Sequence, residues 1–345
     1  MEFLYMKDKI LTISIASYNA EKDISRCLES MIKTSVFDYL DIIVVNDGST
    51  DKTSEIASKY AIKFPNSIRL IDKKNGGHGS TINVGILEAK GKYFKIVDSD
   101  DWVDKDGIEN LVNFLSVSDV DLVMNPYHTI NFNSLKRVDL IDPCPQYIKK
   151  NDILLIEQLR GYEELYMHSM TFKTEIMQKV GPVIDEHCFY VDMEYCIYPL
   201  VYTKSVCYLE TPVYQYLLGS QTQSVSVSSI VKRRNEHKRV LSSLINFYVK
   251  NFIKNSNYVN SVKNIIYKRI SQAIETQYVI YLFMGGKIAK REMDDFSNFL
   301  KNFEFKFPFS NTITLKSIFM AILISSNTFT FLMLSVFYKN IKKIW

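Results

Sequence analysis

Apolar runs and helical spacings alternate along the first 125 residues. The apolar runs are typical of buried strands, and they lie at 10–16, 41–45, 68–71, 93–97 and 121–124. Between them, apolar residues recur at helical spacing at 21–32, 51–64 and 80–89, and again from residue 105. Strands that alternate with helices are joined by right-handed crossovers. The pattern therefore predicts an α/β fold with a mostly parallel sheet and helices on both faces.

The chain is long enough for more than one domain. It has 345 residues, of which 47% are hydrophobic and 23% are charged, so a large core can form and disorder throughout is excluded. We expect an α/β domain over 1–225, with halves at 8–125 and 126–225, and a helical region over 226–345. The five cysteines include no CxxC pair, and the first residues lack a signal-peptide pattern. We therefore expect neither a disulfide scaffold nor a zinc module. We expect a cytoplasmic location.

The charge is divided unequally between the two parts. From Val231 to Trp345 there are 19 Lys+Arg and 6 Asp+Glu, a balance of +13, whereas the first 230 residues have a balance of −9. This asymmetry indicates an anionic partner for the basic part, although solvated lysine-rich helix faces explain it equally well. Nucleic acid is not an expected partner.

The stretch Ser317–Tyr338 contains 22 residues without a charge, which by count could cross a bilayer. The polar run at 325–328 favours two shorter apolar helices instead, packed on the protein or lying in a membrane interface. The lysines at 339, 342 and 343 would then meet anionic headgroups. We expect peripheral contact with a membrane.

Polar residues and glycines follow each of the first four expected strands, at 17–19, 46–51, 73–79 and 98–101. In open α/β sheets, ligands bind at the carboxyl ends of the strands, so these segments predict one site. Asp98, Asp100 and Asp101 repel one another unless a cation or strong donors compensate. Their oxygen ligands suit Mn²⁺ or Mg²⁺, and a helix cap without a metal is the alternative.

Three segments together resemble a known family: SIASYNAEKDISRCLES, IIVVNDGSTDKT and NGGHGSTINVGILEAKGKYFKIVDSDDW. In this order and spacing they resemble the nucleotide-sugar domain of the family 2 inverting glycosyltransferases, which have the GT-A fold. The resemblance is close over residues 8–125 and looser to about residue 225. It implies a bacterial enzyme of surface-polysaccharide synthesis.

The resemblance also implies a role for each polar residue at this edge of the sheet. Asp47 would contact the base, typically uracil, Asp98 would lie near the ribose, and Asp100 would hold the metal. The full set of expected nucleotide-sugar contacts is Ser17, Tyr18, Glu21, Asp47, Lys74, Asn83, Asp98 and Ser99.

Sugar transfer also requires a general base on the acceptor side. The segment FYVDMEY resembles the acidic motif of the family and places Asp192 in this role. The usual form is Glu-Asp, but Val191 precedes the aspartate here, so Glu194 is a second candidate. Residues two apart on a helix point to different faces, so only one of them can face the sugar.

Further contacts are expected on the acceptor and phosphate sides. His168 lies in the acceptor-side segment, where a structural histidine is equally plausible. Gln223 and Ser224 resemble a loop over the diphosphate, although they could form a polar linker. Arg233 could assist the leaving diphosphate or simply begin a helix.

The function expected from these residues is metal-dependent inverting transfer of a hexosyl or N-acetylhexosaminyl group. The donor would be a nucleotide-sugar, typically a UDP-sugar, and the acceptor a lipid-linked saccharide at the inner face of the cytoplasmic membrane. Two alternatives are a non-catalytic module that binds nucleotide-sugars and a sugar nucleotidyltransferase. The latter should carry a glycine-rich basic loop after the first strand, where this chain has SYNAEKD.

Overall fold

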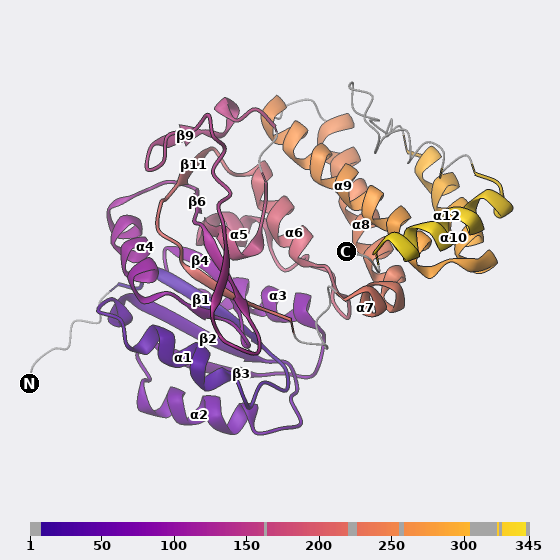
Figure 1. Cartoon of the computed structure of the whole chain (residues 1–345). Coiled ribbons are helices and arrows are strands. Elements are labelled where there is room, and N and C mark those ends of the chain that lie inside the picture. Colours follow the sequence, from indigo (N-terminus) through magenta and orange to yellow (C-terminus); the bar gives the residue numbers. More distant parts are fainter. Residues whose placement is uncertain are drawn as a thin grey trace, which may run out of the picture. The chain divides into compact units, whose positions relative to one another are not determined.

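The computed structural model describes residues 8–161, 164–219, 226–254, 259–303, 323 and 326–342 (Figure 1). The chain divides into two compact units. The first comprises Met1–Ser220 with Val259–Val262, and the second comprises Gln221–Tyr258 with Lys263–Trp345.

An eight-stranded sheet forms the centre of the first unit. Its strands lie in the order β3 (Ile68–Asp72), β2 (Leu40–Asn46), β1 (Leu11–Ser17), β4 (Tyr93–Asp98), β10 (Met170–Lys173), β6 (Leu122–Met124), β11 (Ser205–Tyr208) and β9 (Ile153–Leu155). The first four are parallel, whereas β10 runs antiparallel to both neighbours and β9 runs antiparallel to β11. Every residue of β2 is buried, as expected for a strand that is covered on both faces. The predicted α/β fold with a mostly parallel sheet is confirmed.

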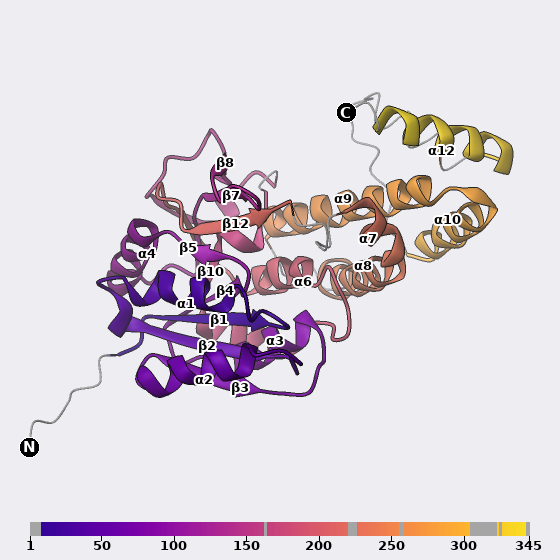
Figure 2. The ribbon, with the colours of Figure 1, turned by 60° about the horizontal axis from the view of Figure 1, so that its bottom comes forward.

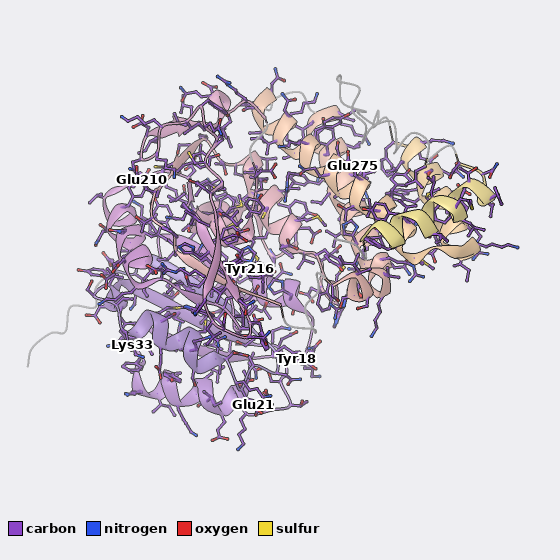
Figure 3. The ribbon with its side chains drawn as sticks, in the orientation of Figure 1. Tyr18, Glu21, Lys33, Glu210, Tyr216 and Glu275 are labelled. Carbon is purple, nitrogen blue, oxygen red and sulfur yellow. The ribbon has the colours of Figure 1, made fainter. Side chains whose placement is uncertain are left out.

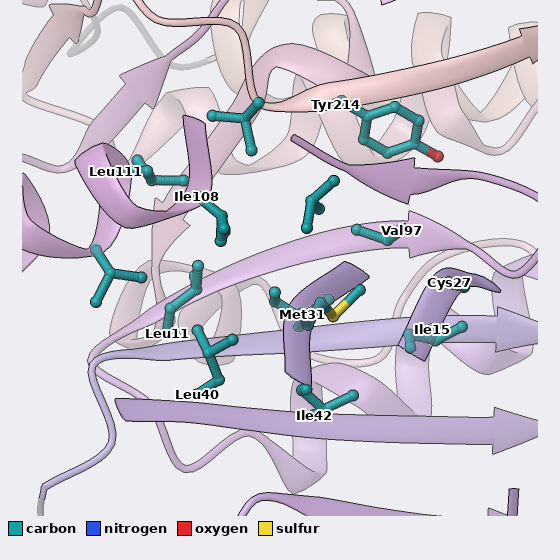
Figure 4. Close-up of a cluster of buried hydrophobic side chains, with 14 of the residues drawn as sticks. Leu11, Ile15, Cys27, Met31, Leu40, Ile42, Val97, Ile108, Leu111 and Tyr214 are labelled. Carbon is teal, nitrogen blue, oxygen red and sulfur yellow. The ribbon is translucent and has the colours of Figure 1, made fainter. Parts of the chain in front are cut away.

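Helices cover both faces of this sheet. They are α1 (Ile24–Ile32), α2 (Thr53–Lys63), α3 (His78–Glu88), α4 (Lys105–Val117), α5 (Thr174–Val180) and α6 (Asp192–Ile197). On one face, Leu11 and Ile15 of β1 share a buried cluster with Met31 of α1 and Leu111 of α4 (Figure 4). On the other face, Ser14 of β1 lies directly against the backbone of α3. This packing aligns the carboxyl ends of the parallel strands with the start of α3.

A second sheet was not expected from the sequence. Its strands lie in the order β5 (Trp102–Val103), β12 (Tyr214–Leu218), β7 (Tyr127–Asn131) and β8 (Arg137–Ile141). Short 3₁₀ turns connect elements at η1 (Phe37–Tyr39), η2 (Ile156–Gln158), η3 (Met167–Ser169) and η4 (Tyr198–Val201). Because β5 follows β4 almost directly, the second sheet lies beside the end of β4 and supplies side chains to the site there.

The second unit is helical, which confirms the expected helical C-terminal region. It contains α7 (Val227–Lys232), α8 (Arg234–Tyr248), the π-helical turn η5 (Val249–Ile253), most of α9 (Asn260–Met284), α10 (Gly286–Lys301) and α12 (Thr328–Lys342) (Figure 2). A hydrogen bond of 2.7 Å between His237 and Gln277 joins α8 to α9. Arg234 donates two bonds, of 2.7 and 2.9 Å, to Glu292 and so joins α8 to α10.

Residues 317–322, 324 and 325 of the uncharged stretch lie outside the described residues, which here include 323 and 326–338. Within the part of the chain that the structure describes, no helix combines the length and apolar character that crossing a membrane requires.

Candidate active site

The carboxylate of Asp98, the last residue of β4, is the centre of the site. Nε2 of His78 lies 3.1 Å from Oδ1 of Asp98. Burial by itself would raise the pKa of Asp98, but the adjacent His78 lowers that pKa below its usual value. Burial lowers the pKa of His78, but Asp98, with smaller contributions from Asp192 and Asp100, raises that pKa above its usual value. His78 is the first residue of α3, so this pair joins the loop after β3 to the end of β4.

The other two aspartates of this loop have contrasting surroundings. Asp101 is 1% exposed; its Oδ2 accepts a hydrogen bond of 2.6 Å from the Tyr214 hydroxyl, and its Oδ1 accepts one of 2.7 Å from the N–H of Leu217. Asp100 is exposed, and desolvation by nearby atoms, together with the charge of Asp98, raises its pKa to about 6. Asp101 therefore fastens the loop to β12, whereas Asp98 and Asp100 remain accessible from outside.

The acidic side chains of the site differ in how well they suit a divalent cation. The ligand atoms of Asp98, Asp101 and His168 lie within 4.8 Å of one another. Both oxygens of Asp101, however, already accept bonds from the protein. Asp98 and Asp100 offer two carboxylates at one strand end, the hard oxygen ligands that Mg²⁺ and Mn²⁺ prefer. This pair fits a cation that is shared with a phosphate ligand.

The two candidate bases lie in different environments. Asp192 begins α6 and is exposed, and its charge raises the pKa of both His78 and Tyr216, so it lies near both side chains. Glu194 is fully buried. Its Oε2 accepts a bond of 2.8 Å from the N–H of Asp185, and its Oε1 accepts one of 2.7 Å from the hydroxyl of Tyr198. Of the two carboxylates, Asp192 is the one that a bound ligand could reach.

Asp47 organises the glycine-containing loop after β3. The side chain is 2% exposed, and its Oδ1 accepts bonds from Nζ of Lys73 at 2.7 Å and from the N–H of Gly76 at 2.8 Å. Its Oδ2 accepts a bond of 2.8 Å from the N–H of Gly77. Lys74, the basic residue expected from the sequence, is exposed, and its neighbour Lys73 is the lysine that reaches Asp47. Lys73 was missed because the two lysines are adjacent and nothing in the sequence separates them.

Asn83 connects α3 to the segment that leads to α6. Its Nδ2 donates a bond of 2.9 Å to the carbonyl of Ile184, and its Oδ1 accepts one of 3.1 Å from the N–H of the same residue. A Cβ on Gly79 would collide with the main-chain oxygen of Asp185, so only glycine allows this approach. The position of Asp192 therefore depends on the packing of α3 against this segment.

An aromatic layer lies beside the acidic residues. The ring of His168 stacks on Tyr216 with centroids 4.2 Å apart, and it meets Tyr214 edge-on at 4.7 Å. Burial lowers the pKa of His168 to about 4, so the ring is neutral at pH 7. Behind it, Nζ of Lys95 donates bonds of 2.8 and 3.2 Å to the carbonyls of His168 and Met170. A lysine that interrupts the apolar run YFKIVD marks this position in the sequence, although Lys95 was not among the expected site residues.

Comparison with known proteins identifies the family. The model for glycosyl transferase family 2 matches residues 12–181. EpsH of Bacillus subtilis, which is named as a glycosyltransferase, is 30% identical over 263 residues, which are 73% of this chain and 71% of EpsH. This chain belongs to glycosyltransferase family 2.

A second sequence relative and one solved structure are also similar to this glycosyltransferase, each over only part of its own length. The minor teichoic acid biosynthesis protein GgaB of Bacillus subtilis is 33% identical over 156 residues, which are 39% of this chain and 17% of GgaB. The crystal structure of S. aureus TarS superimposes with a TM-score of 0.55 and 17% identity, covering 85% of this chain and 48% of that chain. The match to TarS supports the fold alone.

The other expected nucleotide-sugar and phosphate-side contacts of this glycosyltransferase differ in exposure and in the unit to which they belong. Ser17 is 1% exposed and Ser99 is 7% exposed, both at strand ends. Tyr18 is 54% exposed, and the exposed Glu21 accepts a bond of 3.1 Å from the N–H of Lys52 (Figure 3). Arg233 lies between α7 and α8, in the second unit. Gln223 and Ser224 lie outside the described residues.

Proposed function

We propose that this glycosyltransferase moves a sugar, with inversion, from a nucleotide-sugar to a hydroxyl of a saccharide acceptor. One observation carries the proposal: His78, Asp98, Asp100, Asp192 and Tyr216 come from four separate segments and converge at the carboxyl end of β4. The carboxyl ends of the strands are where open α/β sheets bind their ligands. A helix cap alone would not require acids from the distant α6.

The donor half of the site would hold the diphosphate through a cation. Asp98 and Asp100 would ligate Mn²⁺ or Mg²⁺, which neutralises negative charge on the leaving diphosphate. Ser17, Tyr18, Glu21 and Ser99 would lie along the nucleotide, typically uridine. Asp47 and Asn83 would act by holding the loop and α3 in place, since both already bond to the protein. Lys74, Gln223, Ser224 and Arg233 remain proposed contacts on the phosphate side.

The acceptor half of the site would supply the base. Asp192 would take the proton of the acceptor hydroxyl as that oxygen bonds to the anomeric carbon and the bond from this carbon to the diphosphate oxygen breaks. The nucleoside diphosphate leaves on the opposite face of the sugar, so the configuration inverts. An exposed carboxylate can accept this proton, whereas a buried carboxylate that accepts two hydrogen bonds cannot do so without losing them.

The acceptor would be a lipid-linked saccharide of cell-surface polysaccharide synthesis. The +13 balance from Val231 onward fits an anionic partner, and such an acceptor presents a phosphate and an acyl chain. GgaB, which the chain resembles in part, is named for minor teichoic acid biosynthesis. We place the enzyme at the inner face of the cytoplasmic membrane on these grounds.

The test measures release of nucleoside diphosphate from a panel of nucleotide-sugars, with a saccharide acceptor and with or without Mn²⁺. Asp192→Asn should lower the turnover number by ~10²-fold or more and leave donor binding by calorimetry unchanged. Glu194→Gln is the matched control, and in the folded fraction it should retain most of its turnover. The opposite ranking would invert the base assignment. Donor binding without any release or transfer would indicate a non-catalytic module.

A further inference from the structure

Helix α12 packs on the second unit by one side. Phe331 is fully buried and Ser335 is 3% exposed, and the hydroxyl of Ser335 donates a bond of 2.9 Å to the carbonyl of Leu282. The rings of Phe283 and Tyr338 meet edge-on with centroids 5.2 Å apart. These contacts fix which side of α12 faces the protein.

The opposite side of α12 is apolar as well, and it is exposed. Phe329 is 73% exposed, and Met333 and Val336 are each 61% exposed. Their spacing of four and then three residues places the three side chains in one stripe along the helix. Single exposed apolar residues are ordinary, but a contiguous stripe marks a surface that meets another apolar phase. We call these three residues the α12 stripe.

The charge of the surrounding sequence selects the partner. After Glu304 the chain contains no Asp or Glu, but it contains lysines at 306, 316, 339, 342 and 343. Two of them, Lys339 and Lys342, belong to the last turns of α12, directly after the stripe. An apolar stripe followed by cationic residues is complementary to a bilayer with anionic headgroups, where acyl chains receive the apolar side chains and headgroups attract the lysines.

We propose that the α12 stripe inserts into the surface of an anionic lipid bilayer. Insertion follows from α12 itself, and only its use rests on the proposed function, because the enzyme would meet its lipid-linked acceptor at that surface. The helix lies along the membrane plane and does not cross it. Phe329, Met333 and Val336 enter the acyl region, while the packed side of α12 remains on the protein.

The experiment is flotation of the full chain with vesicles of phosphatidylcholine alone or mixed with phosphatidylglycerol, at low and high salt. The parent protein should float with the anionic vesicles, and less so at high salt. A variant with Phe329→Ser, Met333→Ser and Val336→Ser should bind these vesicles at least roughly tenfold more weakly. The matched control changes three exposed apolar residues of the first unit, Ile62→Ser, Leu87→Ser and Val117→Ser, and should float like the parent.

Two additional measurements separate the outcomes. In the Phe329→Trp variant, the tryptophan emission should shift to shorter wavelength when anionic vesicles are added. This substitution reports insertion and keeps the stripe apolar. Transfer to a soluble saccharide should be equal in the parent and the serine variant, which separates failure of the inference from failure of the proposed function. Equal flotation of both proteins would overturn the inference. Salt-insensitive binding to neutral vesicles would also overturn it. The same holds if the parent forms a dimer that the serine substitutions dissociate and neither protein binds vesicles.

Discussion

Replacing Lys95 with methionine removes a charge from the interior of the main sheet. Lys95 is 0% exposed, and its Nζ donates to the carbonyls of His168 and Met170. Among the residues that the structure describes, none provides a carboxylate within ion-pairing distance of this Nζ. Burial lowers the pKa of Lys95 from its ordinary value of 10.5 to about 7. The folded protein therefore binds this proton more weakly than the unfolded chain does.

The size and the sign of the effect follow from that difference. Each pH unit corresponds to about 1.4 kcal/mol, so a shift from 10.5 to about 7 corresponds to an upper limit of about 5 kcal/mol. Between pH 7 and 10.5 the unfolded chain holds the proton and the folded protein has lost it, so stability rises with pH in this window. Below pH 7 both states are protonated and the full cost of burying the charge applies. Methionine carries no proton in either state.

The assay is urea denaturation of the parent and of Lys95→Met at pH 6, 7, 8 and 9. The free energy of unfolding of the parent, minus that of the variant, should be constant up to about pH 7 and then rise by about 1.4 kcal/mol per pH unit. In this difference, the contributions of the groups that titrate equally in both proteins cancel.

Lys173→Met is the matched control on the adjacent strand β10. Lys173 is 8% exposed, and its Nζ lies 2.8 Å from Asp119. Burial lowers its pKa, but Asp119, with Asp121 and Glu175, raises the pKa above the ordinary value. Its stabilising contribution is therefore complete below the unfolded pKa and is lost only at higher pH, so the control difference should be constant from pH 6 to 9. A constant difference for Lys95→Met as well would refute the reasoning, because Lys95 would then have an ordinary pKa.

Three further substitutions test the framework of the site and its proposed metal ligand. Gly79→Ala forces a Cβ against the main-chain oxygen of Asp185 and should lower the free energy of unfolding by about 1–3 kcal/mol in urea denaturation; an unchanged value would contradict the close approach of this segment to α3. Tyr214→Phe leaves one oxygen of the buried Asp101 without its donor and should lower the free energy of unfolding by roughly 1–3 kcal/mol; an unchanged value would contradict that role. Asp100→Ala should abolish Mn²⁺ binding in calorimetry without loss of thermal stability, and unaltered binding would reject Asp100 as a ligand.

Strands β1, β2 and β4 could be predicted because each is an apolar run that is almost entirely buried, whereas the edge strand β3 was recognised as a short run between two helical spacings. The eight-stranded order could not, since β10 enters between β4 and β6 from a segment about 50 residues further along the chain. The second sheet was missed for a different reason. Its strand β5 has only two residues, too few for a periodic pattern, and β8 has five residues of which four are exposed, so no buried apolar face marks it as a strand.

The residue types of the site could also be predicted, but their division of labour could not. The acidic run DSDD does not distinguish the buried Asp101 from the exposed Asp100. The difference depends on Tyr214 and Leu217, which lie more than 110 residues away in the sequence. His78 was not among the expected site residues, because its segment was interpreted from the glycines beside it. Its pairing with Asp98 depends on how α3 packs against β4, which the sequence does not show.

Burial separates the acids that hold the fold from those that we propose act on a ligand. Asp47, Asp101 and Glu194 are each at most 2% exposed, and each accepts protein hydrogen bonds on both carboxylate oxygens. A buried carboxylate satisfied in this way loses stabilising bonds if it takes up a cation or a proton. Asp100 and Asp192 are instead exposed. It follows that substituting the buried acids should mainly lower stability, whereas substituting the exposed acids should mainly lower turnover in a protein that remains folded.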